Sequence, residues 1–125
     1  MADPFFDTGV VADWLLGHDK AANELLRYRK HRISRIVWTA LLAREPVHQR
    51  SRLVQLLAPF EIVEVDARIA AAAADLCNRS PMSLMDALIL ATAQVNGAIL
   101  ITRNTKDFPA NMPGIRVPYT LSPGH

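Results

Sequence analysis

Residues 82–108, with the sequence MSLMDALILATAQVNGAILITRNTKDF, restrict the possible folds more than any other part of this chain. The residues after Asp86 are apolar on nearly every side, which is typical of a helix buried in a domain interior. Asn96 and Gly97 are the residues expected where a helix ends, and residues 98–101 form an apolar run of strand length. The stretch therefore predicts a buried helix, a turn and a central strand.

Polar residues follow this strand at once, in the segment TRNTKD at residues 102–107. Asp7 has a comparable place after the short apolar run of residues 5–6, and Asp86 lies near the start of the buried helix. Ligands of open α/β sheets bind beyond the carboxyl ends of the strands. We therefore expect Asp7, Asp86, Asn104 and Asp107 to meet at one edge of the sheet.

Carboxylates that meet in one pocket repel each other, so they either hold a proton or bind a cation. Oxygen ligands favour Mg²⁺ or Mn²⁺ over zinc, and a carboxylate-held Mg²⁺ supports cleavage of phosphodiesters. The single cysteine and the four histidines have no zinc-ligand spacing. A purely structural interpretation stays open for each acid: Asp7 and Asp86 as helix caps, and Asp107 as a turn former.

Strand patterns alternate with helix patterns along the whole chain. Strands are predicted at residues 5–6, 33–37, 60–65, 98–101 and 115–117, with the strand at 60–65 near a sheet edge. Helices are predicted at residues 10–15, 19–31, 38–44, 47–57, 67–78 and 86–96. This order indicates an α/β fold, with a parallel sheet between two layers of helices. We expect one domain over residues 1–125, with a loose tail from about Pro118.

Composition and charge indicate the cellular compartment and the kinds of partner to expect. The single cysteine, Cys77, allows no disulfide within the chain, and we find no signal peptide or membrane span, so we expect a cytoplasmic protein. The net charge is only +2, but nine basic residues and two acids lie between Lys20 and Arg52. This concentration favours a nucleic-acid partner or a solvated basic helix face, and charge alone does not separate these two interpretations.

Two segments resemble the PIN-domain ribonucleases and, within them, the VapC-type toxins of bacterial toxin–antitoxin pairs. FFDTGVVADWL is similar to the opening strand of that family, with its first acid at Asp7. LMDALILATAQVNGAILITRNTKDF is similar to its D-A-L-I-x-A-T-A helix and T-R-N-x-x-D-F turn. The resemblance implies a three-layer α/β/α sandwich, Mg²⁺- or Mn²⁺-dependent RNA cleavage, inhibition by a cognate antitoxin, and a homodimer or toxin–antitoxin hetero-oligomer.

The resemblance also implies roles for individual residues. Asp7 and Asp86 match acidic metal ligands, Asn104 matches a position that holds aspartate or asparagine, and Asp107 supplies a further carboxylate. The catalytic set implied is therefore Asp7, Asp86, Asn104 and Asp107, and the metal ligands among them are the three aspartates. The residues implied beside the phosphate or the RNA backbone are Thr8, Thr102 and Arg103.

The chain departs from the family at two positions. The family has a glutamate on the helix after the second strand, whereas ISRIVWTALL places Ala40 there. Glu45 is a poor substitute, because five residues at about 100° each turn it away from the face of Ala40. Gly9 stands where the family usually has asparagine or serine. We therefore expect little or no cleavage by this chain.

Three functional hypotheses follow from the sequence. The first is a toxin-type endoribonuclease impaired by Ala40, and the second is a non-enzymatic PIN-like module that binds an antitoxin or RNA without cleaving it. The third, phosphoryl transfer with Asp7 as nucleophile, is weakened by Gly9, because haloacid-dehalogenase-like sites have an aspartate at that place. We also expect an antitoxin helix to dock near Val10, Val11, Trp14 and Leu15, with residues 27–35 meeting acidic residues or RNA.

Overall fold

The computed structural model describes residues 3–120. Five parallel strands form one sheet in the order β3-β2-β1-β4-β5, which confirms the predicted α/β class. The strands are β1 (Phe5–Phe6), β2 (Arg32–Ser34), β3 (Glu61–Val63), β4 (Leu100–Ile101) and β5 (Ile115–Arg116). β3 lies at a sheet edge, as its alternating pattern predicts, and β1 lies in the middle.

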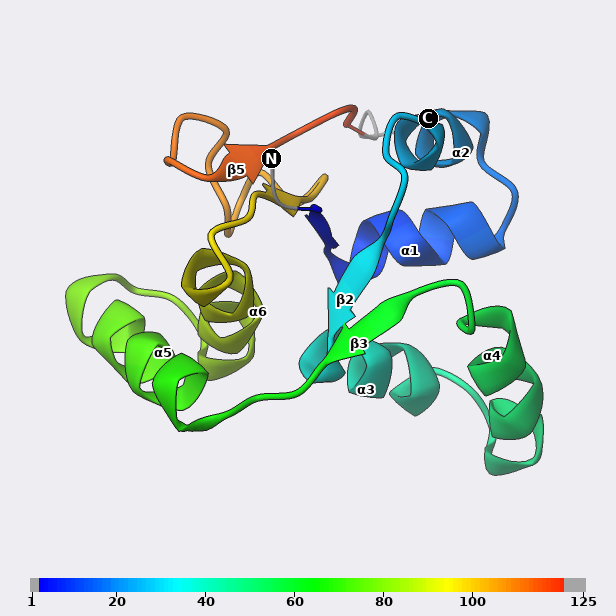
Figure 1. The fold of residues 1–125 in the computed structure, drawn as a ribbon, viewed down its shortest axis with the longest axis horizontal. Coiled ribbons are helices and arrows are strands. Elements are labelled where there is room, and N and C mark those ends of the chain that lie inside the picture. Colours follow the sequence, from blue (N-terminus) through cyan, green and yellow to red (C-terminus); the bar gives the residue numbers. More distant parts are fainter. Residues whose placement is uncertain (1–2, 121–125) are drawn as a thin grey trace.

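Helices cover both faces of the sheet (Figure 1). The helices α5 (Ala67–Arg79) and α6 (Leu84–Val95) pack against each other on one side. The helices α1 (Thr8–Leu15), α2 (Asp19–Leu26) and α4 (Arg50–Leu56) lie on the other side. Helix α3 (Arg35–Ala43) contacts both α1 and α6, and a 3₁₀ turn, η1 (Val47–Gln49), precedes α4. The three-layer sandwich predicted from the sequence is therefore confirmed.

The sheet interior is the centre of the hydrophobic core. Phe5 and Phe6 of β1 pair in parallel register with Leu100 and Ile101 of β4, and all four side chains are buried. These strands are apolar at every position because helices cover both faces of a parallel sheet. The same register brings the ends of β1 and β4 to one level, and the chain continues there into Asp7 and Thr102.

Side-chain caps fix where the helices begin. Residues 35–37, predicted as strand, are the first turn of α3, because Ser34 Oγ accepts a hydrogen bond of 3.1 Å from the Val37 amide. Ser83 caps α6 in the same way, so Asp86 lies in its first turn and is not its cap. Helix α2 ends at Leu26, five residues before the predicted end at His31.

Only the first residues of the predicted C-terminal tail, 118–120, are described. The Tyr119 hydroxyl donates a hydrogen bond of 2.7 Å to Asp13 in α1, so the chain is attached at that residue. The rest of the predicted tail, residues 121–125, lies outside the described residues. Across residues 3–120, each helix is too short or too polar to cross a lipid bilayer.

Candidate active site

A pocket of about 700 Å³ opens beyond the carboxyl ends of β1 and β4. The start of α1, one face of α3, the start of α6 and the loop after β4 form its walls. The four residues predicted to be catalytic all line this pocket: Asp7, Asp86, Asn104 and Asp107. The structure therefore brings together residues that are up to a hundred positions apart in the chain, as the parallel-strand argument predicted.

Asp7 is the most enclosed of these acids, with 7% of its surface exposed. Its Oδ1 accepts a hydrogen bond of 2.8 Å from the Thr8 amide, and its Oδ2 accepts one of 2.7 Å from the Thr102 hydroxyl. Burial raises the pKa of the Asp7 carboxyl above its usual range, although these two hydrogen bonds oppose the shift. Asp7 caps α1 and also lines the pocket, so the two interpretations of this residue are compatible.

Asp86 lines the same pocket as Asp7, from the first turn of α6. Burial raises the pKa of its carboxyl, and the negative charges of Asp107 and Asp7 raise it further, against a hydrogen bond from Ser83. The three carboxylates are therefore close enough to repel one another. A cation or a proton between them would relieve this repulsion.

A tight loop presents Asn104 and Asp107. The Asn104 side-chain amide donates a hydrogen bond of 2.8 Å to Asp107 Oδ2, and the Asp107 amide donates one of 3.2 Å to Asn104 Oδ1. The Asn104 backbone amide donates a hydrogen bond of 3.0 Å to the Thr102 hydroxyl. The buried Phe108 ring anchors the end of the loop. Asp107 is thus a turn former as well as a pocket residue, and one of its oxygens is already engaged.

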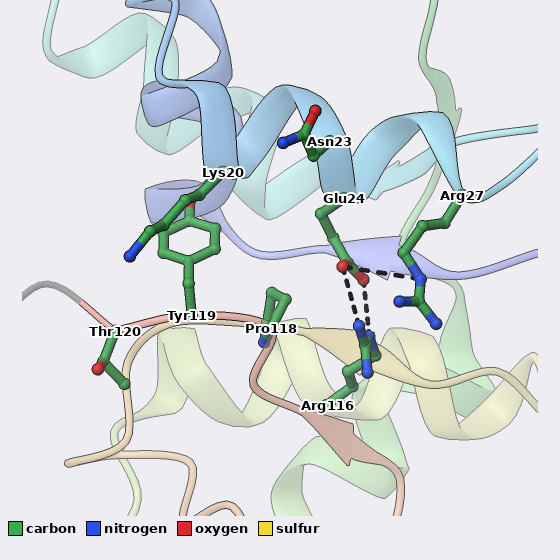
Figure 2. Close-up of a pocket in the computed structure, with 8 residues that line it drawn as sticks. All are labelled: Lys20, Asn23, Glu24, Arg27, Arg116, Pro118, Tyr119 and Thr120. Carbon is green, nitrogen blue, oxygen red and sulfur yellow. Dashed lines mark hydrogen bonds and ion pairs between the residues drawn. The ribbon is translucent and has the colours of Figure 1, made fainter.

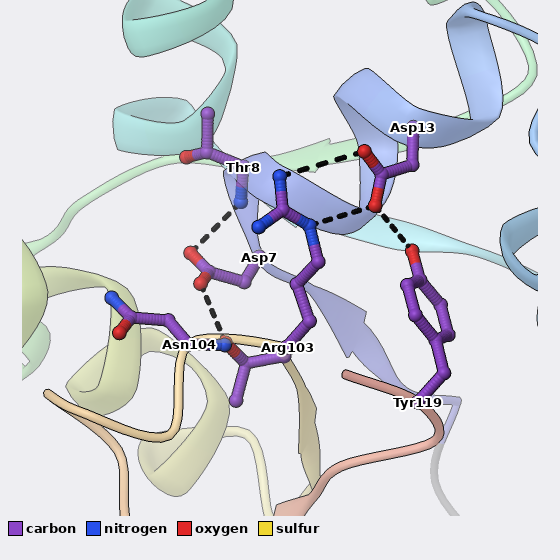
Figure 3. Close-up of polar contacts among 7 residues, drawn as sticks. Asp7, Thr8, Asp13, Arg103, Asn104 and Tyr119 are labelled. Carbon is purple, nitrogen blue, oxygen red and sulfur yellow. Dashed lines mark hydrogen bonds and ion pairs between the residues drawn. The ribbon is translucent and has the colours of Figure 1, made fainter. Parts of the chain in front are cut away.

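Arg103 is held in the pocket wall by a residue that the sequence analysis missed (Figure 3). Its Nε donates a hydrogen bond of 2.7 Å to Asp13 Oδ2, and the Tyr119 hydroxyl donates to the same oxygen at 2.7 Å. A signal for Asp13 was present, since it is an acid within the apolar stripe of α1. Tyr119 had no such signal, because it follows a proline in a segment without periodicity.

The side of the pocket formed by α3 carries no acid. Ala40 lines it where the family resemblance implies a glutamate, and Arg44, one helical turn later, also lines it. The positive charge of Arg44 favours the ionised form of Asp7 and so opposes the rise in its pKa that burial causes. Glu45 is not among the lining residues, as its angular position on the helix predicted.

Two features of this pocket fit a hydrated divalent cation. Mg²⁺ is usually bound by one or two carboxylates together with water and substrate phosphates, and acidic oxygens on two sides of an open pocket match that pattern. The Thr8 Oγ1 atom, also in the pocket wall, is buried and has no hydrogen-bond partner among the described residues. Within residues 3–120 no group of three or more acidic, histidine or cysteine side chains is placed to hold a metal ion, so an ion here would depend on water and substrate phosphates for part of its coordination.

A second polar pocket, of about 620 Å³, lies between α2 and the segment after β5 (Figure 2). Its central acid, Glu24, is 4% exposed and pairs with Arg116 through hydrogen bonds of 2.7 and 3.0 Å. The Tyr28 hydroxyl donates a further hydrogen bond of 2.9 Å to Glu24. Glu24 is thus fully engaged inside the protein, which indicates a structural role that attaches α2 to β5.

The structure corrects the prediction of an apolar docking site on α1, because only part of the predicted set is accessible. Val10 and Val11 are completely buried, because they face the sheet, and cannot contact a partner. Trp14 instead lines an apolar pocket of about 300 Å³ with residues of α2 and the β3 side, including Leu26 and Phe60. The Trp14 and Phe60 rings meet edge to face, with centroids 5.3 Å apart. The pocket therefore lies between α1, α2 and the turn before β3.

The fold and the pocket define an α/β protein with acidic residues gathered beyond the ends of its central parallel strands. The family model of the PIN domain matches residues 5–111. The chain belongs to the PIN domain family, and the resemblance seen in the sequence is confirmed. No curated protein matched the chain.

Several solved structures share this fold. A toxin–antitoxin complex from Klebsiella pneumoniae contains a chain that is 36% identical, with a TM-score of 0.87, and the match covers 95% of this chain and 100% of that chain. VapBC2 from Rickettsia felis, bound to a DNA fragment from its promoter, is 23% identical over 91% and 96% of the two chains, with a TM-score of 0.74. FitAcB from Neisseria gonorrhoeae is 20% identical over 94% and 99%, with a TM-score of 0.75. The two more distant structures show the fold alone.

Proposed function

We propose that this chain is the endoribonuclease toxin of a type II toxin–antitoxin pair, and that Ala40 impairs its cleavage activity. The observation that carries the proposal is the convergence of Asp7, Asp86 and Asp107 on one pocket, where burial and then the charges of Asp107 and Asp7 raise the pKa of Asp86. The similarity to a chain in the Klebsiella pneumoniae toxin–antitoxin complex supports the toxin assignment. The whole chain, residues 1–125, would act as one domain, in the cytoplasm where RNA and an antitoxin meet.

The proposal includes a Mg²⁺ or Mn²⁺ ion, which Asp7, Asp86 and Asp107 would hold. When bound, such an ion supplies an activated water and stabilises the charge on a phosphodiester. The Thr8 amide and the Thr102 hydroxyl fix the Asp7 carboxylate in one orientation, so its oxygens need no rearrangement to act. Asn104 holds Asp107 in place through the turn that they share.

The substrate would be RNA, whose phosphates meet positive charge on the pocket rim. Arg44, Arg103 and Lys106 line the same pocket as the acids. Guanidinium groups bind phosphate oxygens with two parallel hydrogen bonds, and ammonium groups bind them as point charges. The Thr8 hydroxyl lies in the pocket wall and would contact the phosphate or the ion. The Thr102 hydroxyl is buried, bonded to Asp7 and to the Asn104 backbone amide, and Thr102 is not among the lining residues, so it would act by orienting Asp7.

A second candidate function is a PIN module that binds RNA or an antitoxin without cleaving. Ala40 and Arg44 favour it, because a methyl group and a cation occupy the side of the pocket where the resemblance implies a carboxylate. Loss of one carboxylate weakens cation binding and leaves the water less well oriented. Both candidate functions therefore predict poor RNA cleavage by the present chain. They differ in whether a carboxylate restored at position 40 produces cleavage.

The partner would be a cognate antitoxin, which places an apolar helix in the pocket beside Trp14 and Leu26. Leu26 is 82% exposed, although large apolar side chains are usually covered in a finished complex. Of the basic residues in segment 27–35, Arg29 and Lys30 line a neighbouring pocket that shares His31, Pro59 and Phe60 with this one, and they would meet acidic antitoxin residues. Arg32 and Arg35 are bonded to the Asp3 carbonyl and to Glu64. A homodimer or a toxin–antitoxin hetero-oligomer is part of the same proposal.

Restoring the missing acid tests the proposal. Purified Ala40→Glu is expected to cleave single-stranded RNA with Mg²⁺ or Mn²⁺ at least about 100-fold faster than the parent chain, the scale of a lost catalytic group. The matched control Ala40→Gln has the same size without the charge and should stay inactive. If Ala40→Glu cuts no RNA and leaves cell growth unaffected, the nuclease proposal is wrong and the non-cleaving module is favoured.

A further inference from the structure

We propose that Asp13 and Tyr119 are positioning residues that hold the Arg103 guanidinium against Gly9, so that Arg103 binds a phosphate of the RNA. The inference rests on the proposed function and deepens it, because it explains how the phosphate contact is built. Asp13 and Tyr119 do not touch the substrate themselves.

Asp13 is the acceptor that binds both Arg103 and Tyr119. Asp13 is 4% exposed and lies on the inner face of α1. It accepts hydrogen bonds from Arg103 Nε at 2.7 Å and from the Tyr119 hydroxyl at 2.7 Å, and Arg103 Nη2 lies 3.5 Å from its second oxygen. A buried carboxylate needs such partners, so the three side chains stabilise one another.

Gly9 provides the space that the guanidinium fills. A Cβ atom added to Gly9 would lie 3.2 Å from both Cζ and Nε of Arg103. The guanidinium therefore packs directly on the glycine backbone, at the position where the family resemblance implies asparagine or serine. The absence of a side chain at Gly9 therefore leaves the space that the Arg103 guanidinium occupies.

The remaining nitrogen of the guanidinium is directed to the pocket. Asp13 engages the Nε and Nη2 side, and the third nitrogen points away from Asp13 toward the side of Asp7 and Thr8 (Figure 3). Arg103 lines the pocket, and its charge opposes the rise in the pKa of Asp7 that burial causes, which agrees with that direction. A phosphate beside Asp7 would thus meet a guanidinium that is already held in place.

The arrangement is also tied to the catalytic acid through the backbone. Arg103 directly follows Thr102, whose hydroxyl binds Asp7, so one short segment positions both the acid and the cation. Tyr119 adds a link from the segment after β5, which otherwise takes no part in the site. Displacing Tyr119 would loosen Asp13 and, through it, Arg103.

The test measures the affinity of the full chain for a short fluorescein-labelled single-stranded RNA in EDTA, so that no cleavage intervenes. Arg103→Gln should weaken binding about tenfold, as expected for one charge-assisted contact. Asp13→Asn should also weaken binding, although it removes a negative charge beside the site. Tyr119→Phe should weaken it by less, because Asp13 keeps its bond to Arg103.

The sign of the Asp13→Asn effect distinguishes positioning from simple charge. If Asp13 acted only through its charge, removing it would strengthen RNA binding. In the Arg103→Gln background, Asp13→Asn should have no further effect on RNA affinity, whereas a general loss of stability would act in both backgrounds. Glu24→Gln is the matched control, since it breaks another buried acid–arginine pair outside the pocket and should leave RNA affinity unchanged.

The outcomes separate this inference from the proposed function. RNA binding by the parent that Asp13→Asn and Tyr119→Phe leave unchanged or strengthen would overturn the positioning roles and leave the nuclease proposal standing. Absence of RNA binding by the parent and by Ala40→Glu would overturn the proposed function, and the phosphate contact with it. If Asp13→Asn does not fold, Tyr119→Phe, which keeps the buried charge and nearly all of the ring packing, decides the question.

Discussion

The Thr102 hydroxyl donates a hydrogen bond of 2.7 Å to Oδ2 of Asp7, which joins the carboxyl ends of β4 and β1. Both residues are buried, and they are 95 positions apart in the chain. The contact exists because β1 and β4 pair in parallel with Phe6 opposite Ile101, so the next residue of each strand reaches the same level. The acidic site is therefore a direct product of strand register.

The enclosure of Asp7 predicts that its charge opposes folding when no cation is present. Burial raises the pKa of Asp7 in the folded state, so the folded protein binds this proton more tightly than the unfolded chain does. The associated stability is present below the unfolded pKa and is lost as the pH rises through the folded pKa. In EDTA at neutral pH, Asp7→Asn should therefore melt at a higher temperature than the parent.

Thermal denaturation between pH 3 and pH 8 checks this prediction, and the gain from Asp7→Asn should shrink toward the acid end, where the parent is also uncharged. Added Mn²⁺ should stabilise the parent and not Asp7→Asn. A destabilised Asp7→Asn at neutral pH would mean that the Thr102 and Thr8 hydrogen bonds outweigh the burial of the charge.

The Glu24–Arg116 pair predicts the opposite pH dependence. Burial acts to raise the pKa of Glu24, but hydrogen bonds from Arg116 and Tyr28 hold it below its usual value. Its stabilising contribution is present above the unfolded pKa and is lost as the pH falls through the folded pKa. Glu24→Gln should lower the free energy of unfolding at neutral pH by about 3 kcal/mol, as expected when one member of a buried pair is removed.

Urea denaturation at several pH values measures this loss, and the difference between Glu24→Gln and the parent should diminish in acid. An equal loss at all pH values would show that packing, rather than the ion pair, accounts for the effect.

Arg44 is expected to limit the rescue by Ala40→Glu. Residues 40 and 44 are one helical turn apart, so a glutamate at position 40 would pair with the Arg44 guanidinium and be partly neutralised. The double variant Ala40→Glu/Arg44→Gln should therefore cleave RNA faster than Ala40→Glu at saturating substrate. Equal or lower kcat in the double variant would contradict neutralisation of the glutamate at position 40 by Arg44, whereas a higher KM would agree with the contact proposed between Arg44 and the RNA phosphates.

Gly9→Ala is expected to separate stability from RNA affinity. The added Cβ would press on the Arg103 guanidinium, which is the far end of a flexible side chain and can shift at small energetic expense. The free energy of unfolding should change by less than about 1 kcal/mol, while RNA affinity falls severalfold. Unchanged RNA affinity would contradict the close packing of Arg103 on Gly9 as a functional feature.

We expect a charge placed in the apolar pocket to weaken the binding of an antitoxin. Leu26→Glu should weaken binding of a co-purified antitoxin at least about tenfold, since an apolar partner helix would bury the new charge. Leu16→Glu is the matched control: Leu16 is 78% exposed and lies outside this pocket, so its replacement should have little effect. Equal affinities of both variants, measured by calorimetry, would place the antitoxin elsewhere.

Much of the fold was predictable from the sequence because its signals are local. The apolar run after Asp86, the stop at Asn96-Gly97 and the alternation of residues 60–65 are periodic patterns, and α6, its end and the edge strand β3 confirm them. The start of α3 was predicted wrongly, since β-branched residues 36 and 37 favour a strand in isolation. The Ser34 cap overrides that preference.

The site was predictable only in part. The meeting of Asp7, Asp86 and the loop after β4 follows from parallel strands, which is a topological argument. The roles of Asp13 and Tyr119 depend on contacts over 90 and 106 positions, and no local pattern encodes such pairing. Val10 and Val11 were wrongly expected at a docking surface, because an apolar stripe does not reveal whether it faces the sheet or a partner.

A crystal structure of the parent chain soaked in Mn²⁺ would show whether the acids share a metal ion, because anomalous scattering locates the ion without any assay of cleavage. We expect an anomalous peak in the pocket bordered by Asp7 and Asp86, and none in the same experiment with Asp7→Asn. A pocket without Mn²⁺ in both the parent and Ala40→Glu would contradict a shared metal site and, with it, the nuclease function proposed for this chain.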